Sequence, residues 1–255
     1  MKKRILAALC LVMILSLAAC KGSDTPAGSN APTGAAPGSK AASQPADTMP
    51  TVLNQSEYVL YQNIFFNDMA DDYVGKKATK EGTLARLYDA FSGKTRYYVW
   101  GYMDATKCCD WQWEFVPADP QSLPAVGSMV KMTGTMVRDE AALDKIWFTD
   151  TSVEVETVFE PVACDVDMTT MDATLERVQL LNMQYKPEAF AGQSLRFYGR
   201  VLTPTSLQHP YYDNTWTQSF ETAGTVPAIG TLVIVSGTWN NGTVSGAEVT
   251  VTKDY

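Results

Sequence analysis

Three cysteines in the body of the chain could do chemistry, and two of them are adjacent. Cys108 and Cys109 closely follow Asp104, and Cys164 comes later in the sequence. Thiolates are soft metal ligands, so one interpretation is a zinc or copper(I) site that Asp104, Asp110 or Cys164 completes. Structural zinc sites usually place two residues between paired cysteines, which argues mildly against a closed zinc site.

The same cysteines have other interpretations. Cys108 or Cys109 could form a disulfide with Cys164, or the adjacent pair could bond to each other in a strained ring that is easily reduced. They could also be reduced or buried and have no task. Thiol–disulfide exchange is disfavoured because the Cys-x-x-Cys spacing of redox motifs is missing. Zinc or copper is the only cofactor that the sequence suggests.

Aromatic residues crowd the same region. Tyr98, Trp100 and Tyr102 share one face of a predicted strand, because side chains alternate along a strand, and Trp111 and Trp113 follow. These rings predict either core packing or a platform on which a ligand stacks. A net charge of −8 disfavours nucleic acid as that ligand and suits an oligosaccharide better.

The elements that must position these residues form an internal repeat. In four pairs of glycines the second residue follows the first by seven positions, and the contexts match: Gly75 and Gly82, Gly127 and Gly134, Gly192 and Gly199, and Gly230 and Gly237. Alternation of apolar and polar residues between them predicts strands, and the second glycine of each pair suits a bulge or bend. Two trios spaced by three residues predict a short helix before each copy: Tyr58, Tyr61 and Ile64, then Leu175, Val178 and Leu181, the second helix capped by Asp172.

A helix and about five short strands in each copy predict a mostly β protein with two tandem five-stranded barrels of the OB type. A β-sandwich is the alternative. The expected domains are residues 51–160 and 161–255. The first copy has fourteen extra residues between its inner glycines, and an added segment on a rigid scaffold is where we expect function.

The N-terminal residues indicate where the protein is targeted. Lys2, Lys3 and Arg4 precede an apolar run over 5–15, which is too short to span a bilayer, and Leu17-Ala18-Ala19-Cys20 follows. This stretch resembles the lipobox of bacterial lipoproteins. The resemblance implies that residues 1–19 are a cleaved signal peptide. It also implies that Cys20 carries the lipid, which includes palmitate-type acyl chains. We expect the protein on the extracytoplasmic face of the cell membrane, with residues 20–50, rich in Gly, Ala, Pro and Ser, as a disordered tether.

A second resemblance concerns the folded part. The glycine pattern, together with Asp104-Ala105-Thr106, Cys108-Cys109 and Glu114-Phe115, resembles OB-like domains of bacterial lipoproteins and permease-associated membrane proteins. It implies a site at the adjacent cysteines without naming its chemistry.

Together these features predict a non-catalytic binding or scaffolding protein. The alternative is a metal-handling lipoprotein that passes zinc or copper from Cys108 and Cys109 to a membrane transporter. The expected partners are the membrane, through the lipid, and an envelope protein or transporter, but not nucleic acid. The lone histidine, His209, argues against most catalytic sites, and its turn-like context predicts an exposed loop residue. Cleavage of residues 1–19 leaves 17 basic and 28 acidic side chains, a net charge of −11.

Overall fold

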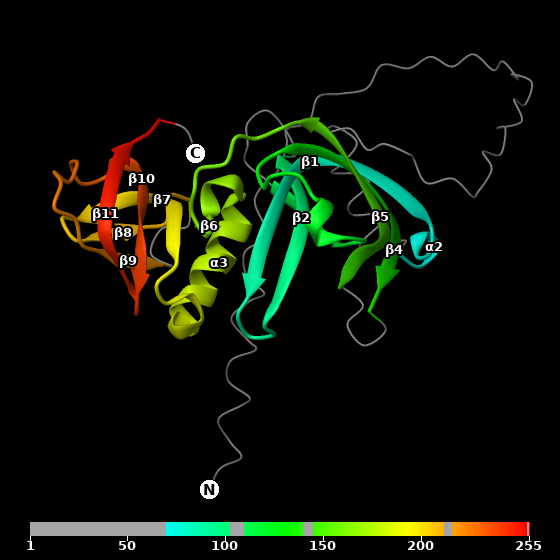
Figure 1. Ribbon diagram of the computed structural model, residues 1–255, viewed down its shortest axis with the longest axis horizontal. Coiled ribbons are helices and arrows are strands. Elements are labelled where there is room, and N and C mark those ends of the chain that lie inside the picture. The colour runs from blue at the N-terminus through cyan, green and yellow to red at the C-terminus, as the bar shows by residue number, and fades with distance from the viewer. Residues whose placement is uncertain (1–69, 103–109, 140–144, 212–215, 254) are drawn as a thin grey trace, which may run out of the picture. The chain divides into compact units, whose positions relative to one another are not determined.

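A computed structural model describes residues 70–102, 110–139, 145–211, 216–253 and 255, and these are mostly β (Figure 1). The first sheet contains β1 (Lys77–Asp89), β2 (Lys94–Tyr102), β3 (Asp110–Pro117), β4 (Met129–Arg138) and β5 (Ile146–Thr157). Its order, β1-β2-β3-β5-β4, closes into a barrel because β1 pairs with β4 through its first half and with β2 through its second. We call these five strands ring 1.

The second sheet repeats this order. It contains β6 (Val166–Asp167), β7 (Ser194–Thr203), β8 (Ser206–Gln208), β9 (Thr217–Phe220), β10 (Leu232–Asn240) and β11 (Thr243–Val251). The order is β10-β11-β9-β8-β7-β6, and β10 also pairs with β7, so β7 to β11 close on themselves and β6 lies at the side of β7. We call β7 to β11 ring 2.

Backbone hydrogen bonds confirm the internal repeat that the glycine spacing predicts. In ring 1 the Gly75 N–H donates to the Met136 carbonyl at 2.9 Å, and in ring 2 Gly192 donates to Trp239 at the same distance. The Gly127 and Gly230 N–H groups likewise donate to Leu84 and Val201, both at 2.8 Å. All four glycines have φ between 79° and 96°, a conformation that side chains with a Cβ rarely adopt, which is why the pattern is readable in the sequence.

The predicted bends are also present. The β4–β5 register shifts at Gly134 and the β10–β11 register shifts at Gly237. Gly82 and Gly199 lie where β1 and β7 change from one partner strand to another.

Helix α3 (Ala173–Tyr185) precedes ring 2, and Asp172 caps it as predicted, accepting a hydrogen bond from the Leu175 N–H at 2.7 Å. The predicted apolar face is wrong in part, because Val178 is exposed and Glu176, Gln179 and Asn182 are buried. The predicted helix before ring 1 lies outside the described residues. The other short elements are α2 (Ala70–Tyr73) and the 3-10 turns η2 (Pro120–Ser122), η3 (Met168–Thr170) and η4 (Pro187–Phe190).

The buried polar residues of α3 have partners in both rings. Glu176 accepts a hydrogen bond from the Tyr198 N–H of β7 at 2.8 Å. The side-chain oxygens of Gln179 and Asn182 accept from the N–H groups of Tyr88 and Ala90, at 2.9 and 3.1 Å. The helix therefore provides hydrogen bonds to the end of β1 and to the residue just after it, where β4 no longer pairs. A purely apolar face could not do this.

Two hydrophobic cores hold the fold. One fills ring 1 and includes Leu84, Val99, Trp113, Phe115 and Phe148. The other lies in ring 2 and around α3, and it extends to Ala85 and Leu87 of β1. Within the described ranges, no helix has the length and apolar character needed to cross a membrane.

The extra residues of the first copy mostly lengthen the β1–β2 hairpin. Seventeen positions separate Thr83 from its partner Trp100, whereas eight separate the equivalent Arg200 from Gln208, so nine of the fourteen lie here. Ala85, Leu87, Tyr98 and Trp100 in this segment pack against the core around α3. The insertion thus joins ring 1 to the second sheet.

Candidate ligand-binding groove

The residues of the predicted metal or thiol site lie mostly outside the described residues. This holds for Asp104, Cys108 and Cys109, and also for the lipidation site Cys20. Cys164 is half-buried with a free thiol, whose pKa is raised by burial and by the negative charge of nearby Asp167. In the part of the chain that is described, no group of three or more His, Cys, Asp or Glu side chains could hold a metal. The metal site and the disulfide both stay predictions.

The predicted stacking residues Trp111 and Trp113 belong to the core of ring 1. Each has at most 4% of its surface exposed, and Trp113 stacks on Phe148 with ring centroids 4.5 Å apart. The Lys80 ammonium, itself buried, lies 3.7 Å from the centroid of the Trp111 ring. Of the two interpretations that the sequence allows, these two rings follow core packing.

Tyr98, Trp100 and Tyr102 point away from the interior of ring 1. Tyr98 and Trp100 pack against the core around α3, and the Trp100 Nε1–H donates to the Thr170 carbonyl at 2.9 Å. Tyr102 meets the Trp100 ring edge-on at 5.5 Å. The face that could have stacked a ligand is used largely to join the two sheets.

His209 is buried, and the prediction of an exposed loop residue is wrong. Its Nε2 atom lies 3.5 Å from a carboxylate oxygen of buried Glu176, and the Tyr255 hydroxyl donates to that carboxylate at 3.0 Å. These partners come from α3 and from the C-terminal end, so local sequence around His209 carries no signal of its burial.

A groove of about 440 Å³ lies on ring 1. Three strands or their ends form it, because the neighbours β2, β3 and β5 meet there. It is lined by Lys94, Thr95, Arg96, Tyr97, Glu114, Phe115, Val116, Pro117, Lys145 and Trp147. No sequence pattern marks any of these residues as a site, although Glu114 and Phe115 contribute to the resemblance to OB-like domains.

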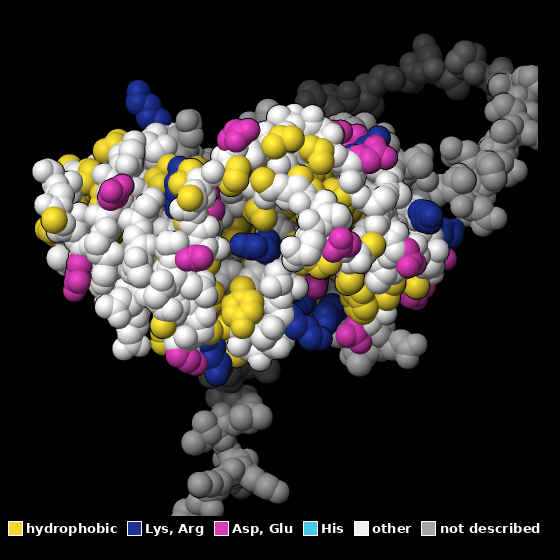
Figure 2. Space-filling view, viewed as in Figure 1, with side chains coloured by type: hydrophobic (Ala, Val, Ile, Leu, Met, Phe, Trp, Pro, Cys, Tyr) yellow, Lys and Arg dark blue, Asp and Glu magenta, His cyan; other side chains and the backbone are white. Residues whose placement is uncertain are grey.

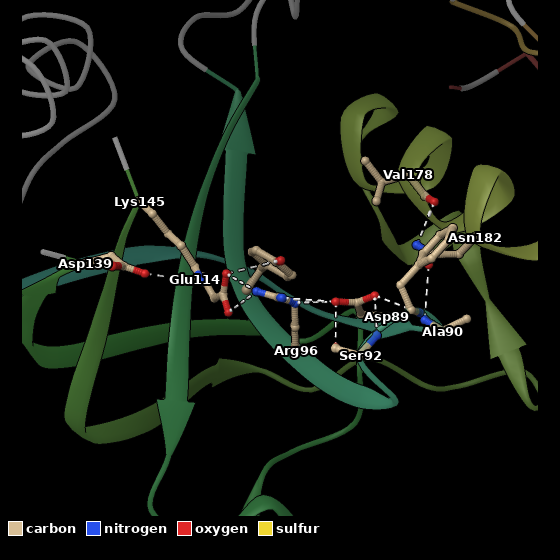
Figure 3. A network of polar contacts seen from close by, with 11 residues as sticks. Asp89, Ala90, Ser92, Arg96, Glu114, Asp139, Lys145, Val178 and Asn182 are labelled. Atoms are coloured by element: carbon tan, nitrogen blue, oxygen red, sulfur yellow. Dashed lines mark hydrogen bonds and ion pairs between the residues drawn. The ribbon is translucent and has the colours of Figure 1, made fainter. Parts of the chain in front are cut away.

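Arg96 holds Glu114 at this groove (Figure 3). Its Nη1 atom donates to both Glu114 oxygens, at 3.0 and 3.2 Å, and its Nη2 atom donates to Asp89 at 3.0 Å. Hydrogen bonds from Ser92 and Arg96 lower the pKa of Asp89 to about 2, so Asp89 remains charged opposite Arg96. These charge-assisted hydrogen bonds to both oxygens orient the Glu114 carboxylate. Burial, and secondly the negative charge of Glu114, raises the pKa of Tyr98.

The rim of the groove carries cations and an aromatic ring. Lys94 and Lys145 are both exposed. The Lys145 ammonium is 5.7 Å from the centroid of the half-buried Trp147 ring and 3.9 Å from an Asp139 oxygen. The groove therefore combines an oriented carboxylate, aromatic surface and positive charge.

A second cavity of about 520 Å³ lies between the β1–β2 hairpin and α3. It shares Arg96 with the groove, and its other walls include Leu87, Tyr98 and Leu181. The exposed rings of Phe91 and Tyr185 lie 6.5 Å apart there. Its lining is mainly apolar, and its polar side chains are Asp89, Arg96 and Asn182.

In comparisons with known proteins, no family model and no curated protein matches the sequence. A proposal of function therefore rests on the geometry of the groove.

Proposed function

We propose that the two rings are tandem OB-like domains. The order β1-β2-β3-β5-β4 of ring 1 recurs as β7-β8-β9-β11-β10 in ring 2, and a five-stranded barrel in about 80 to 100 residues suits the OB type. OB barrels bind oligonucleotides and oligosaccharides on the face of their second and third strands and the adjoining loops. The groove of ring 1 lies on β2 and β3 and at the start of β5.

The protein is, in this proposal, a lipid-anchored binding protein on the extracytoplasmic face of the membrane, and its ligand is an oligosaccharide. The anchor is Cys20, on the strength of the Leu17-Ala18-Ala19-Cys20 sequence. The net charge of −8 favours a sugar over nucleic acid, because nucleic-acid affinity depends on neutralising phosphates with a basic face.

The observation that carries the proposal is the Glu114 carboxylate, whose two oxygens accept hydrogen bonds from Arg96, in a groove that the Trp147 ring also lines. A fixed carboxylate accepts hydrogen bonds from sugar hydroxyls without first losing orientational freedom. An aromatic ring offers the apolar face on which a sugar ring rests. Both groups are needed together to recognise a molecule that is polar at its edge and apolar on its face.

The test is calorimetric titration of the full chain in detergent micelles with a panel of oligosaccharides. Glu114→Gln keeps the shape and removes the charge, and hydrogen bonds to charged groups contribute about 1.5–3 kcal/mol, so affinity should fall by roughly tenfold to hundredfold. Glu154→Gln is the matched control, because Glu154 is exposed on β5 away from the groove. The proposal fails if no oligosaccharide binds, or if both variants bind as well as the unaltered protein.

A further inference from the structure

Charge at the groove differs from charge over the chain. The side chains that line it include three cations, Lys94, Arg96 and Lys145, and one anion, Glu114, and the carboxylates of Asp89 and Asp139 pair with Arg96 and Lys145 from its rim. The chain as a whole has a net charge of −8. Figure 2 shows acidic side chains spread over the visible face of the described residues, with Lys and Arg in a few separate groups. The groove and its rim are therefore balanced in charge on an acidic protein, which makes this place more favourable for an anionic ligand than the acidic surface around it.

Two of these cations remain available to a ligand. Arg96 is occupied by Glu114 and Asp89 (Figure 3). In contrast, no ion pair involves Lys94 within the described ranges. The pair of Lys145 with Asp139 is long at 3.9 Å and exposed, and pairs of this kind contribute about 0–1 kcal/mol, so a ligand can replace it.

The position of Lys145 links charge to stacking. Its ammonium is 5.7 Å from the centroid of the Trp147 ring. A sugar that rests on this ring brings a substituent at its edge within reach of the ammonium. A carboxylate or phosphate at that edge would gain a charge-assisted hydrogen bond, which is roughly twice as strong as a neutral one.

We propose that the oligosaccharide bound in this groove carries an anionic substituent, a carboxylate or a phosphate, that Lys94 and Lys145 recognise beside Trp147. This inference rests on the proposed function and adds the class of its ligand. Glu114 accepts hydrogen bonds from hydroxyl groups of the sugar, and the two lysines select the oligosaccharide that carries the anionic substituent.

Matched ligands test the inference on the full chain in detergent micelles. One pair is a hyaluronan hexasaccharide and its carboxyl-reduced form, and the other is a phosphorylated mannan oligosaccharide and its phosphatase-treated form. The charged member of at least one pair should bind about tenfold tighter or more, and the pair that shows the difference identifies carboxylate or phosphate as the group. Raising sodium chloride from about 0.05 to 0.5 M should weaken the charged member selectively, because salt screens exposed charges.

Variants distinguish the lysines from the rest of the groove. Lys94→Gln with Lys145→Gln should remove the preference for the charged member and leave the affinity for the neutral member within about twofold. Lys77→Gln is the control, because Lys77 is exposed at the start of β1 and does not line the groove. Retained binding of the neutral member also shows that the double variant is folded.

The outcomes separate the two proposals. Equal binding of charged and neutral members overturns the inference and leaves the proposed function standing. A preference that survives in the double variant also overturns it, since other groups would then recognise the charge. Absence of binding by all four oligosaccharides overturns the proposed function and the inference with it.

Discussion

Because of Asp172, the folded protein should become less stable as pH rises toward neutral. It caps α3, it accepts a hydrogen bond from Gln112 of β3 at 2.7 Å, and only 1% of its surface is exposed. Burial, and secondly the negative charge of Asp110, raises the pKa of Asp172 from 3.8 to about 7. The folded protein therefore holds a proton on Asp172 in a range where the unfolded chain has released it.

The sign follows from proton linkage. Between about pH 4 and 7 the folded state binds more protons at this residue, so the free energy of unfolding falls as pH rises, and the effect of this residue levels off above 7. A pKa near 7 instead of 3.8 corresponds to about 4 kcal/mol in total, of which about 3 kcal/mol falls between pH 5 and 8. The raised pKa of buried Glu176 adds to the trend in the same direction.

The variant Asp172→Asn isolates this contribution, because Asn caps helices about as well as Asp and does not ionise. Urea unfolding of the full chain at pH 5 and pH 8 measures it. The unaltered protein should lose about 3 kcal/mol more than the variant across this interval. Asp119→Asn is the control, since Asp119 caps the short turn η2 but is exposed. Equal pH dependence of Asp172→Asn and the unaltered protein would refute the reasoning.

Three other predictions concern the anchor, the helix and a buried lysine. Cys20→Ser should abolish palmitate labelling and move the protein from the membrane fraction to the soluble fraction; persistent labelling would contradict the lipid anchor. Gln179→Ala leaves the Tyr88 N–H of β1 without its acceptor, Asn182→Ala does the same to the Ala90 N–H just after β1, and each should cost about 1–3 kcal/mol in urea unfolding, whereas Gln184→Ala, an exposed control, should cost less. Burial lowers the pKa of Lys80 to about 7, so stability should rise between about pH 7 and 10 in the unaltered protein and stay flatter in Lys80→Met, as thermal melts would show.

The sequence predicts the repeat because its signals are local. Glycines with positive φ, such as Gly75 and Gly192, have few substitutes, so their spacing marks equivalent turns in both copies. The Asp172 cap is also a local signal, since a short acceptor before a helix binds the N–H three residues on. The mostly β fold is predicted from the alternation of apolar and polar residues between these glycines.

The groove is not predictable in this way. Arg96 and Glu114 are eighteen positions apart, and Lys145 and Trp147 join them only because β5 follows β3 around the ring. The sequence also leaves the role of the aromatic residues open between core packing and ligand stacking, because a partner such as Thr170, to which Trp100 donates a hydrogen bond, lies 70 positions away. The burial of Glu176, Gln179 and Asn182 likewise depends on two rings whose contact no periodicity reveals.

Backbone and side-chain NMR shifts of the isotopically labelled full chain test most directly whether the ring 1 groove binds an oligosaccharide. Titration with the oligosaccharide that binds best should shift the signals of Tyr97, Glu114 and Trp147 together, in a saturable manner. Shifts confined to Phe91 and Tyr185, at the cavity between the hairpin and α3, would contradict the claim, as would no saturable shift at all.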